Sequence, residues 1–150
     1  MTRGREPADR PTPLPDVDPR DVLAEIWATV DLDRVLGELG ATAEVLPDDP
    51  LLGAAIRLVR REAGPPIAFA EPISEGRLAA GLVRFGEGPA GRYVAAPSSL
   101  PAAVRESTAP GVLLSRPAEG PFGRARLVLG GPVAGPHLVL VDRTAGTIDR

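Results

Sequence analysis

The strongest candidate for a chemically active residue is His137, the only histidine in the chain. Imidazole titrates near neutral pH, so a histidine that faces a cleft can act as an acid, a base or a hydrogen-bonding group. Side chains alternate along a strand, so His137 and Val139 would share one face of residues 137–142. The competing interpretation is structural: His137 follows Pro136 at the start of a strand and is half solvated.

Arginines form the second group of candidates. Arg124 and Arg126 share one face of an expected strand, and Arg57 is their counterpart in an earlier segment. Arginines that line a cleft would favour carboxylate or phosphate ligands, because a guanidinium group donates two parallel hydrogen bonds. A solvated polar face explains the same pattern. Tyr93 could likewise hydrogen-bond a ligand, or it could lie at a sheet edge.

Composition restricts the class of protein. The chain has 150 residues, 43% of them hydrophobic, which suits one domain or two small modules around a folded core. A net charge of −3 with few aromatic residues gives no surface for nucleic acid. No apolar run is long enough to span a membrane, and none follows the early arginines as a secretory signal would. We therefore expect a cytoplasmic protein with neither a nucleic acid nor a membrane as partner.

The candidate residues must be positioned by elements that begin after residue 19, because residues 1–19 are rich in proline and are expected to be a disordered lead-in. Residues 26–30 are typical of a strand, and a helix should follow to residue 39, with Asp31 as its N-cap and Gly40 after its end. One helix over residues 18–39 fits the same spacing, and local pattern does not decide between the two.

The remaining segments continue with strands and two more helices. Ser74 can cap a helix that presents Leu78, Leu82 and Phe85 on one face, and Ser98 or Ser99 can open another. The expected strands are residues 55–60, 66–71, 92–96, 112–115, 124–129 and 137–142.

Matching residues recur in the same order in the two halves of the chain. The pairs are separated by a slowly increasing interval and include Leu32 with Leu100, Arg57 with Arg126, and Gly64 with Gly135. This internal repeat predicts an α+β fold of two βαβββ modules, residues 21–85 and 90–143, within a domain of residues 20–150. Glu71 and Asp142 end equivalent strands, where they could form a carboxylate pair or brace neighbouring segments.

Two segments resemble a known family. Gly86-Glu87-Gly88-Pro89-Ala90-Gly91-Arg92-Tyr93-Val94 and Gly135-Pro136-His137-Leu138-Val139-Leu140-Val141-Asp142 are similar to the hinge and last strand of the glyoxalase, bleomycin-resistance and methylmalonyl-CoA epimerase group, the vicinal oxygen chelate superfamily. The resemblance covers residues 21–143 and implies two modules that form a curved mixed sheet around a cleft. It also implies a homodimer and a divalent metal held by four His, Glu or Gln side chains.

The chain departs from this family at the implied metal ligands. The four equivalent positions are Ala24, Ala68, Ala90-Gly91 and Val139. A cation needs several oxygen or nitrogen donors, and these side chains offer none, so we expect no metal and no cofactor.

Three functions follow from these residues. The first is a metal-free cleft that binds a small oxygenated or anionic metabolite. Its ligand-binding residues would be Arg57, Arg124, Arg126, Tyr93 and Val139. The alternative is a metal-independent isomerase or lyase that uses His137 as its catalytic acid or base. The third is a dimerisation module without a small ligand.

Overall fold

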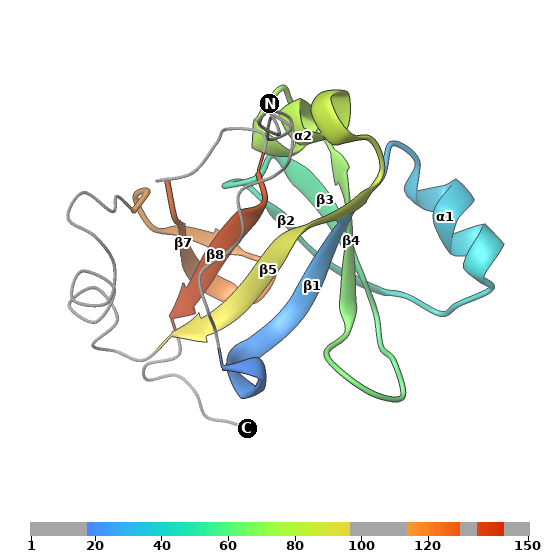
Figure 1. The fold of residues 1–150 in the computed structure, drawn as a ribbon, viewed down its shortest axis with the longest axis horizontal. Helices are drawn as coiled ribbons and strands as arrows, with labels where there is room; N and C mark the ends of the chain where they lie inside the picture. The colour runs from blue at the N-terminus through green and yellow to red at the C-terminus, as the bar shows by residue number, and fades with distance from the viewer. Residues whose placement is uncertain (1–17, 97–113, 130–134, 143–150) are drawn as a thin grey trace, which may run out of the picture.

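The computed structural model describes residues 18–96, 114–129 and 135–142. These residues form an α+β fold with one eight-stranded sheet (Figure 1). In chain order the elements are a 3₁₀ turn (Pro19–Asp21), β1 (Val22–Ala28), α1 (Leu32–Leu39), β2 (Glu44–Asp49), β3 (Ala54–Val59), β4 (Ile67–Pro72), α2 (Arg77–Phe85), β5 (Gly88–Ala96), β6 (Ala118–Gly120), β7 (Gly123–Leu127) and β8 (His137–Asp142).

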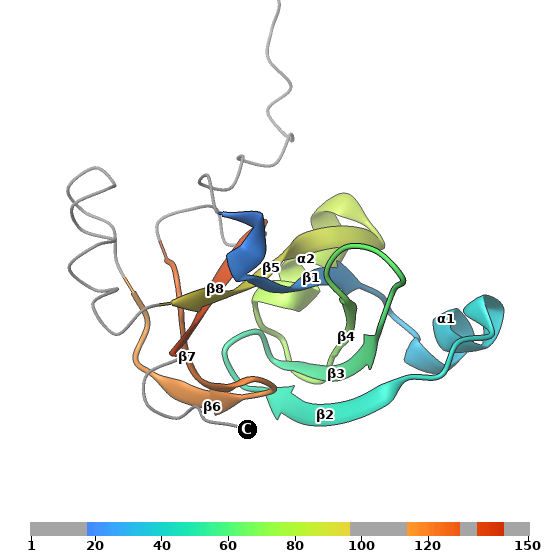
Figure 2. The same cartoon turned by 90° about the horizontal axis from the view of Figure 1, so that it is seen from below.

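The strand order shows the two predicted modules. The sheet runs β2-β3-β4-β1-β5-β8-β7-β6, so each half places its first strand beside its last. The β1–β4 and β5–β8 pairs are parallel, and the antiparallel β1–β5 pair joins the halves. The sheet curves until its edge strands β2 and β6 come into contact, and Figure 2 shows the resulting, nearly closed barrel. The predicted α+β, glyoxalase-like architecture is confirmed.

The inside of this barrel is an apolar core. One face of every long strand points inward, as the alternating pattern predicts, and both modules contribute to one cluster of buried side chains. On β8 the inward residues include Val139 and Val141, whereas Leu138 and Leu140 belong to a second cluster on the outer face. The interior is therefore filled by side chains.

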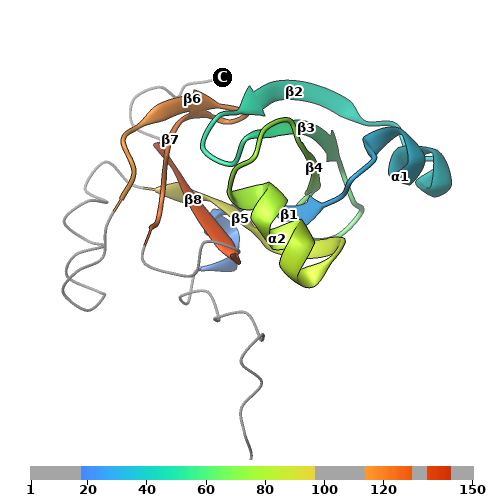
Figure 3. The same cartoon turned by 90° about the horizontal axis from the view of Figure 1, so that it is seen from above.

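The two helices lie outside the sheet and differ in how they are held. The Asp31 carboxylate accepts a hydrogen bond from the Arg34 amide at 3.1 Å, and Gly40 ends α1 in the left-handed conformation, as predicted. By contrast, α2 begins after Gly76 without a side-chain cap, so the expected cap by Ser74 is wrong. Figure 3 shows α2 across one end of the barrel, where it packs against β4 and β5.

Other sequence expectations need correction. A single helix over residues 18–39 does not form, because β1 is hydrogen-bonded on both sides, to β4 and to β5. The sequence analysis assigned no element to Glu44–Asp49, which is the edge strand β2. Of the expected strand 112–115, residues 112–113 lie outside the described residues, Leu114 makes an isolated bridge to Val128, and the Ser115 amide donates to the Leu127 carbonyl at 2.8 Å. The edge strand β6 was not expected. The expected lead-in (residues 1–17) and the helix after Ser98 lie outside the described residues.

Candidate functional site

A cavity of about 280 Å³ lies beneath α2, between that helix and strands β1, β5 and β8. Most of its lining is apolar or glycine: Ala28, Leu78, Gly81, Phe85, Gly86, Pro89, Ala90, Gly91 and Pro136. Three polar side chains complete it: Glu25, Arg92 and His137. Ligand sites in proteins have this character, with a mainly apolar wall and a few polar groups that orient the ligand.

His137 is held in this wall by the close approach of two strands. It is the first residue of β8, its side chain is only 3% exposed, and it pairs in register with Gly91 of β5. Gly91 has a φ of 150°, and a Cβ at this position would overlap the His137 backbone. Gly135 covers the imidazole from the other side, where a Cβ would lie 3.0 Å from Nε2. Both glycines are therefore needed for the histidine to occupy this place.

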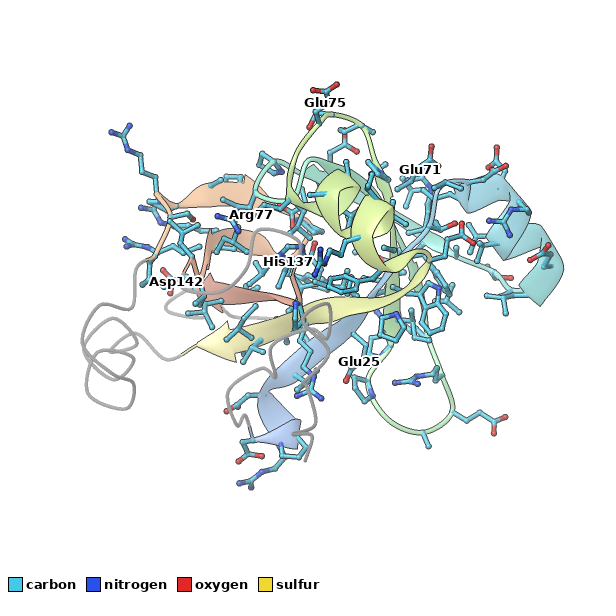
Figure 4. The ribbon with its side chains drawn as sticks, turned by 45° about the horizontal axis from the view of Figure 1, so that its top comes forward. Glu25, Glu71, Glu75, Arg77, His137 and Asp142 are labelled. Carbon is cyan, nitrogen blue, oxygen red and sulfur yellow. The ribbon has the colours of Figure 1, made fainter. Side chains whose placement is uncertain are left out.

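The protonation state of His137 follows from its surroundings. Burial, and to a smaller extent the positive charge of Arg77, lower the pKa of the imidazole to about 4. A hydrogen bond with the Arg77 backbone opposes this shift. His137 is therefore neutral at pH 7. Figure 4 shows its ring beneath α2, with Arg77 at the start of that helix.

Glu25 and Arg92 form the charged part of the cavity wall. They pair across the β1–β5 register, with Arg92 Nε 3.4 Å from Glu25 Oε1. Each side chain is 37% exposed, so solvent reaches both. Their opposite charges leave this part of the wall without net charge.

Three of the four positions that the family resemblance assigns to a metal lie inside the barrel, and the fourth, Ala90-Gly91, lines the cavity beneath α2. Ala24, Ala68 and Val139 are completely buried in one core cluster, and Tyr93 pairs in register with both Ala24 and Val139. The expected alignment thus brings these positions together. None of the three side chains carries a donor atom, so this part of the interior does not fit a divalent ion. No group of three or more acidic or histidine side chains suited to a metal occurs in the described part of the chain.

The polar groups inside the barrel bind each other. Tyr93 Oη donates a hydrogen bond of 2.5 Å to Asp49 Oδ2, and Asp49 Oδ1 accepts from the amides of Leu51 and Leu52 at 2.7 and 3.2 Å. Phe122 packs on the Tyr93 ring with 4.9 Å between ring centroids. Burial raises the pKa of both Asp49 and Tyr93. Tyr93 is thus engaged within the core and is not among the residues that line the cavity.

The three predicted ligand-binding arginines are not among the residues that line this cavity. Arg124 is exposed on β7, and Arg126 pairs in register with Leu140. The apolar face of β7, formed by Ala125 and Leu127, lies in the barrel core. Arg57 is half-buried on β3, where it donates to the Ile56 carbonyl at 3.1 Å.

The two candidate carboxylates are also separate. Glu71 Oε1 accepts a hydrogen bond from the amide of Leu32, at the start of α1, at 3.0 Å. Asp142 is exposed at the end of β8, far from Glu71 in Figure 4. Glu71 thus caps the start of α1 and does not form a carboxylate pair with Asp142.

Sequence reasoning missed the role of Glu87. Its Oε2 accepts hydrogen bonds from Thr29 Oγ1 at 2.7 Å, the Val30 amide at 2.9 Å and Arg34 at 2.5 Å. These bonds lower the pKa of Glu87 to about 2, and the bond from the Val30 amide has the largest effect. Glu87 therefore ties the hinge before β5 to the loop that begins α1. In the sequence, the glycines on either side of Glu87 indicate a hinge, but they do not indicate which residues bind the Glu87 carboxylate.

Comparison with known proteins identifies the fold. No protein-family model matches the chain, and neither does any curated protein. Among solved structures, a hypothetical protein from Bacillus halodurans C-125 matches with a TM-score of 0.64 and 19% identity, over 85% of this chain and 97% of that one. A Streptomyces coelicolor methylmalonyl-CoA epimerase variant in complex with 2-nitronate-propionyl-CoA matches with a TM-score of 0.64 and 18% identity, over 83% and 95%. The methylmalonyl-CoA epimerase from Mycobacterium tuberculosis matches with a TM-score of 0.64 and 19% identity, over 81% of this chain and 87% of that one.

These likenesses establish a shared fold. The chain has the architecture of methylmalonyl-CoA epimerase, the glyoxalase-like fold of the vicinal oxygen chelate superfamily, as the sequence resemblance predicted. In the described part of the chain, no helix is long and apolar enough to cross a bilayer.

Proposed function

We propose that this protein binds a small oxygenated organic molecule in the cavity beneath α2, without a metal. The observation that carries the proposal is the cavity itself: about 280 Å³, mainly apolar, with three polar side chains in its wall. A protein cavity of about 150 Å³ lined by apolar side chains binds benzene. By that measure, the space beneath α2 holds a ligand of about ten non-hydrogen atoms.

The charges favour an uncharged ligand over an anion. Among the described residues that line the cavity, Arg92 is the only positively charged side chain at pH 7, and Glu25 already neutralises it. A carboxylate ligand would have to separate Arg92 from Glu25 while approaching a second negative charge. A neutral oxygenated molecule meets no such cost. Of the two ligand classes expected from the sequence, oxygenated or anionic, the cavity therefore favours an uncharged oxygenated molecule.

Binding is also better supported than turnover. An isomerase or lyase would need His137 as an acid or base near neutral pH. With a pKa of about 4, the buried imidazole is a weak base and lacks the acidic second proton of an imidazolium at pH 7, which a general acid would give to a leaving group. Homodimerisation and a cytoplasmic location stay predictions made from the sequence and from the family resemblance.

The test is a titration with cyclohexanol, followed by amide chemical shifts in two-dimensional NMR. We expect saturable shifts of the Gly81, Ala90 and Gly91 amides. Ala90→Leu fills the cavity and should abolish them, whereas Ala63→Leu adds the same three carbon atoms in the exposed turn between β3 and β4 and should not. Absence of shifts in the wild-type protein, or equal shifts in folded Ala90→Leu, would overturn the proposal.

A further inference from the structure

The buried edge of His137 restricts what the cavity can bind. Its Nε2 atom is buried and has no hydrogen-bond partner among the described residues. The imidazole has only two nitrogens, so the hydrogen bond with the Arg77 backbone is made by Nδ1. Because that bond favours the protonated form, the ring donates and the Arg77 carbonyl oxygen accepts. The single proton of the neutral ring is therefore on Nδ1, which leaves Nε2 with a free lone pair.

We propose that the ligand of this cavity is an uncharged molecule that donates a hydrogen bond, from a hydroxyl or an N–H group, to His137 Nε2. This inference rests on the proposed function of the cavity and specifies the chemistry of its ligand. A buried acceptor without a partner destabilises the protein, so almost all such groups in proteins are satisfied by a protein group, water or a ligand. The cavity that His137 lines is where a ligand can supply the donor.

The charged groups around the ring argue against other ligands. On α2, Arg77 is close enough to lower the pKa of His137, so a cationic donor such as an ammonium group would be repelled. On β1 and β5, Glu25 and Arg92 are paired with each other, and neither bonds His137. A carboxylate or an ether oxygen has lone pairs but no proton to donate, so neither can form a hydrogen bond with the lone pair of His137 Nε2. A neutral alcohol or amide meets the acceptor and avoids both repulsions.

A matched pair of probes separates this inference from the proposed function. Cyclohexanol and cyclohexanone have the same ring and nearly the same size, but only the alcohol can donate. A neutral hydrogen bond makes binding about three- to tenfold tighter, so we expect that ratio of Kd values in favour of cyclohexanol in the wild-type protein. In His137→Phe, which keeps a planar ring without the acceptor, the two Kd values should become equal.

The wild-type protein also offers a direct readout that needs no substitution. His137 is the only histidine, so in protein without an affinity tag its imidazole ¹⁵N signals need no assignment by mutation. Cyclohexanol should shift the Nε2 resonance towards the hydrogen-bonded value, and cyclohexanone should leave it unchanged.

The outcomes are distinct. If neither probe binds the wild-type protein, the proposed function fails. If both bind with equal Kd values and neither moves the Nε2 resonance, the cavity is a binding site but the donor requirement is wrong. A preference for the alcohol that persists in folded His137→Phe would also overturn the inference, because another acceptor would then be responsible.

Discussion

The hydrogen bond between Tyr93 and Asp49 offers the sharpest test of how the barrel interior is held together. Tyr93→Phe removes the hydroxyl group and leaves the ring in place against Phe122. Asp49 is 1% exposed and keeps its two amide donors on Oδ1, but Oδ2 loses the 2.5 Å bond from Tyr93. Removing one partner of a buried hydrogen bond to a charged group costs about 2 kcal/mol, so the free energy of unfolding should fall by about that amount at pH 7.

Urea denaturation followed by circular dichroism measures this loss. With a slope of about 2 kcal/mol per molar urea, the midpoint should move down by about 1 M. The matched control is Phe122→Leu, which loses the ring contact with Tyr93 but keeps the hydrogen bond. It should cost about 1 kcal/mol and leave the titration of Asp49 unchanged.

The pH dependence separates a hydrogen-bond effect from a packing effect. Burial raises the pKa of Asp49 in the folded state, and the bond from Tyr93 opposes this shift. A carboxyl group with a raised folded-state pKa favours folding while it is protonated, and this contribution is lost as the pH rises through the folded-state pKa. Tyr93→Phe raises that pKa further, so its cost should be larger at pH 7 than at pH 4. A loss below about 0.5 kcal/mol, or one independent of pH, would refute this account of the interior.

Three further predictions concern other parts of the molecule. Glu87 should contribute its full stabilisation above pH 4.5 and lose it as the pH falls toward about 2, so thermal unfolding of Glu87→Gln should vary less over that range than that of the wild type. Gly91→Ala should destabilise the protein by about 3 kcal/mol or more in urea, because its Cβ overlaps the His137 backbone; a near-neutral result would contradict that packing. Elemental analysis of protein purified without chelator should find far less than one zinc, iron, manganese or nickel per chain, and a stoichiometric metal lost in His137→Ala would show the opposite.

The sequence predicts the elements whose signals are local. Helix α1 is recognisable because its cap Asp31 and its terminal Gly40 are adjacent to the apolar residues that they bound. Strands β3, β4 and β8 are recognisable from short apolar runs between turns. Edge strand β2 could not be predicted, because most of its residues are exposed and it contains Pro47. Neither periodicity nor composition therefore indicates a strand there.

The candidate site could be predicted only in part. His137 was identified because a lone histidine stands out, and the structure places it in the cavity wall. Its environment depends on where α2 lies relative to β5 and β8, which no local pattern encodes. The bond between Tyr93 and Asp49 joins residues 44 positions apart, and its strength comes from burial that only the closed barrel provides. Arginine takes the place of every lysine in this chain, so an arginine on a strand says little about a ligand, and a binding role for Arg57, Arg124 and Arg126 stays a prediction.

The side chains inside the barrel and the position of the proposed binding site are related through packing. Ala24 lies in register with Tyr93, and a small side chain there leaves room for the aromatic ring to fill the interior. A donor side chain at Ala24 or Val139 would compete with that ring for space. If it were charged, its burial there would cost several kcal/mol. The packing at these positions therefore does not fit a metal centre. The space left for a ligand is therefore at the end of the barrel, where α2 covers the sheet without filling the volume beneath it.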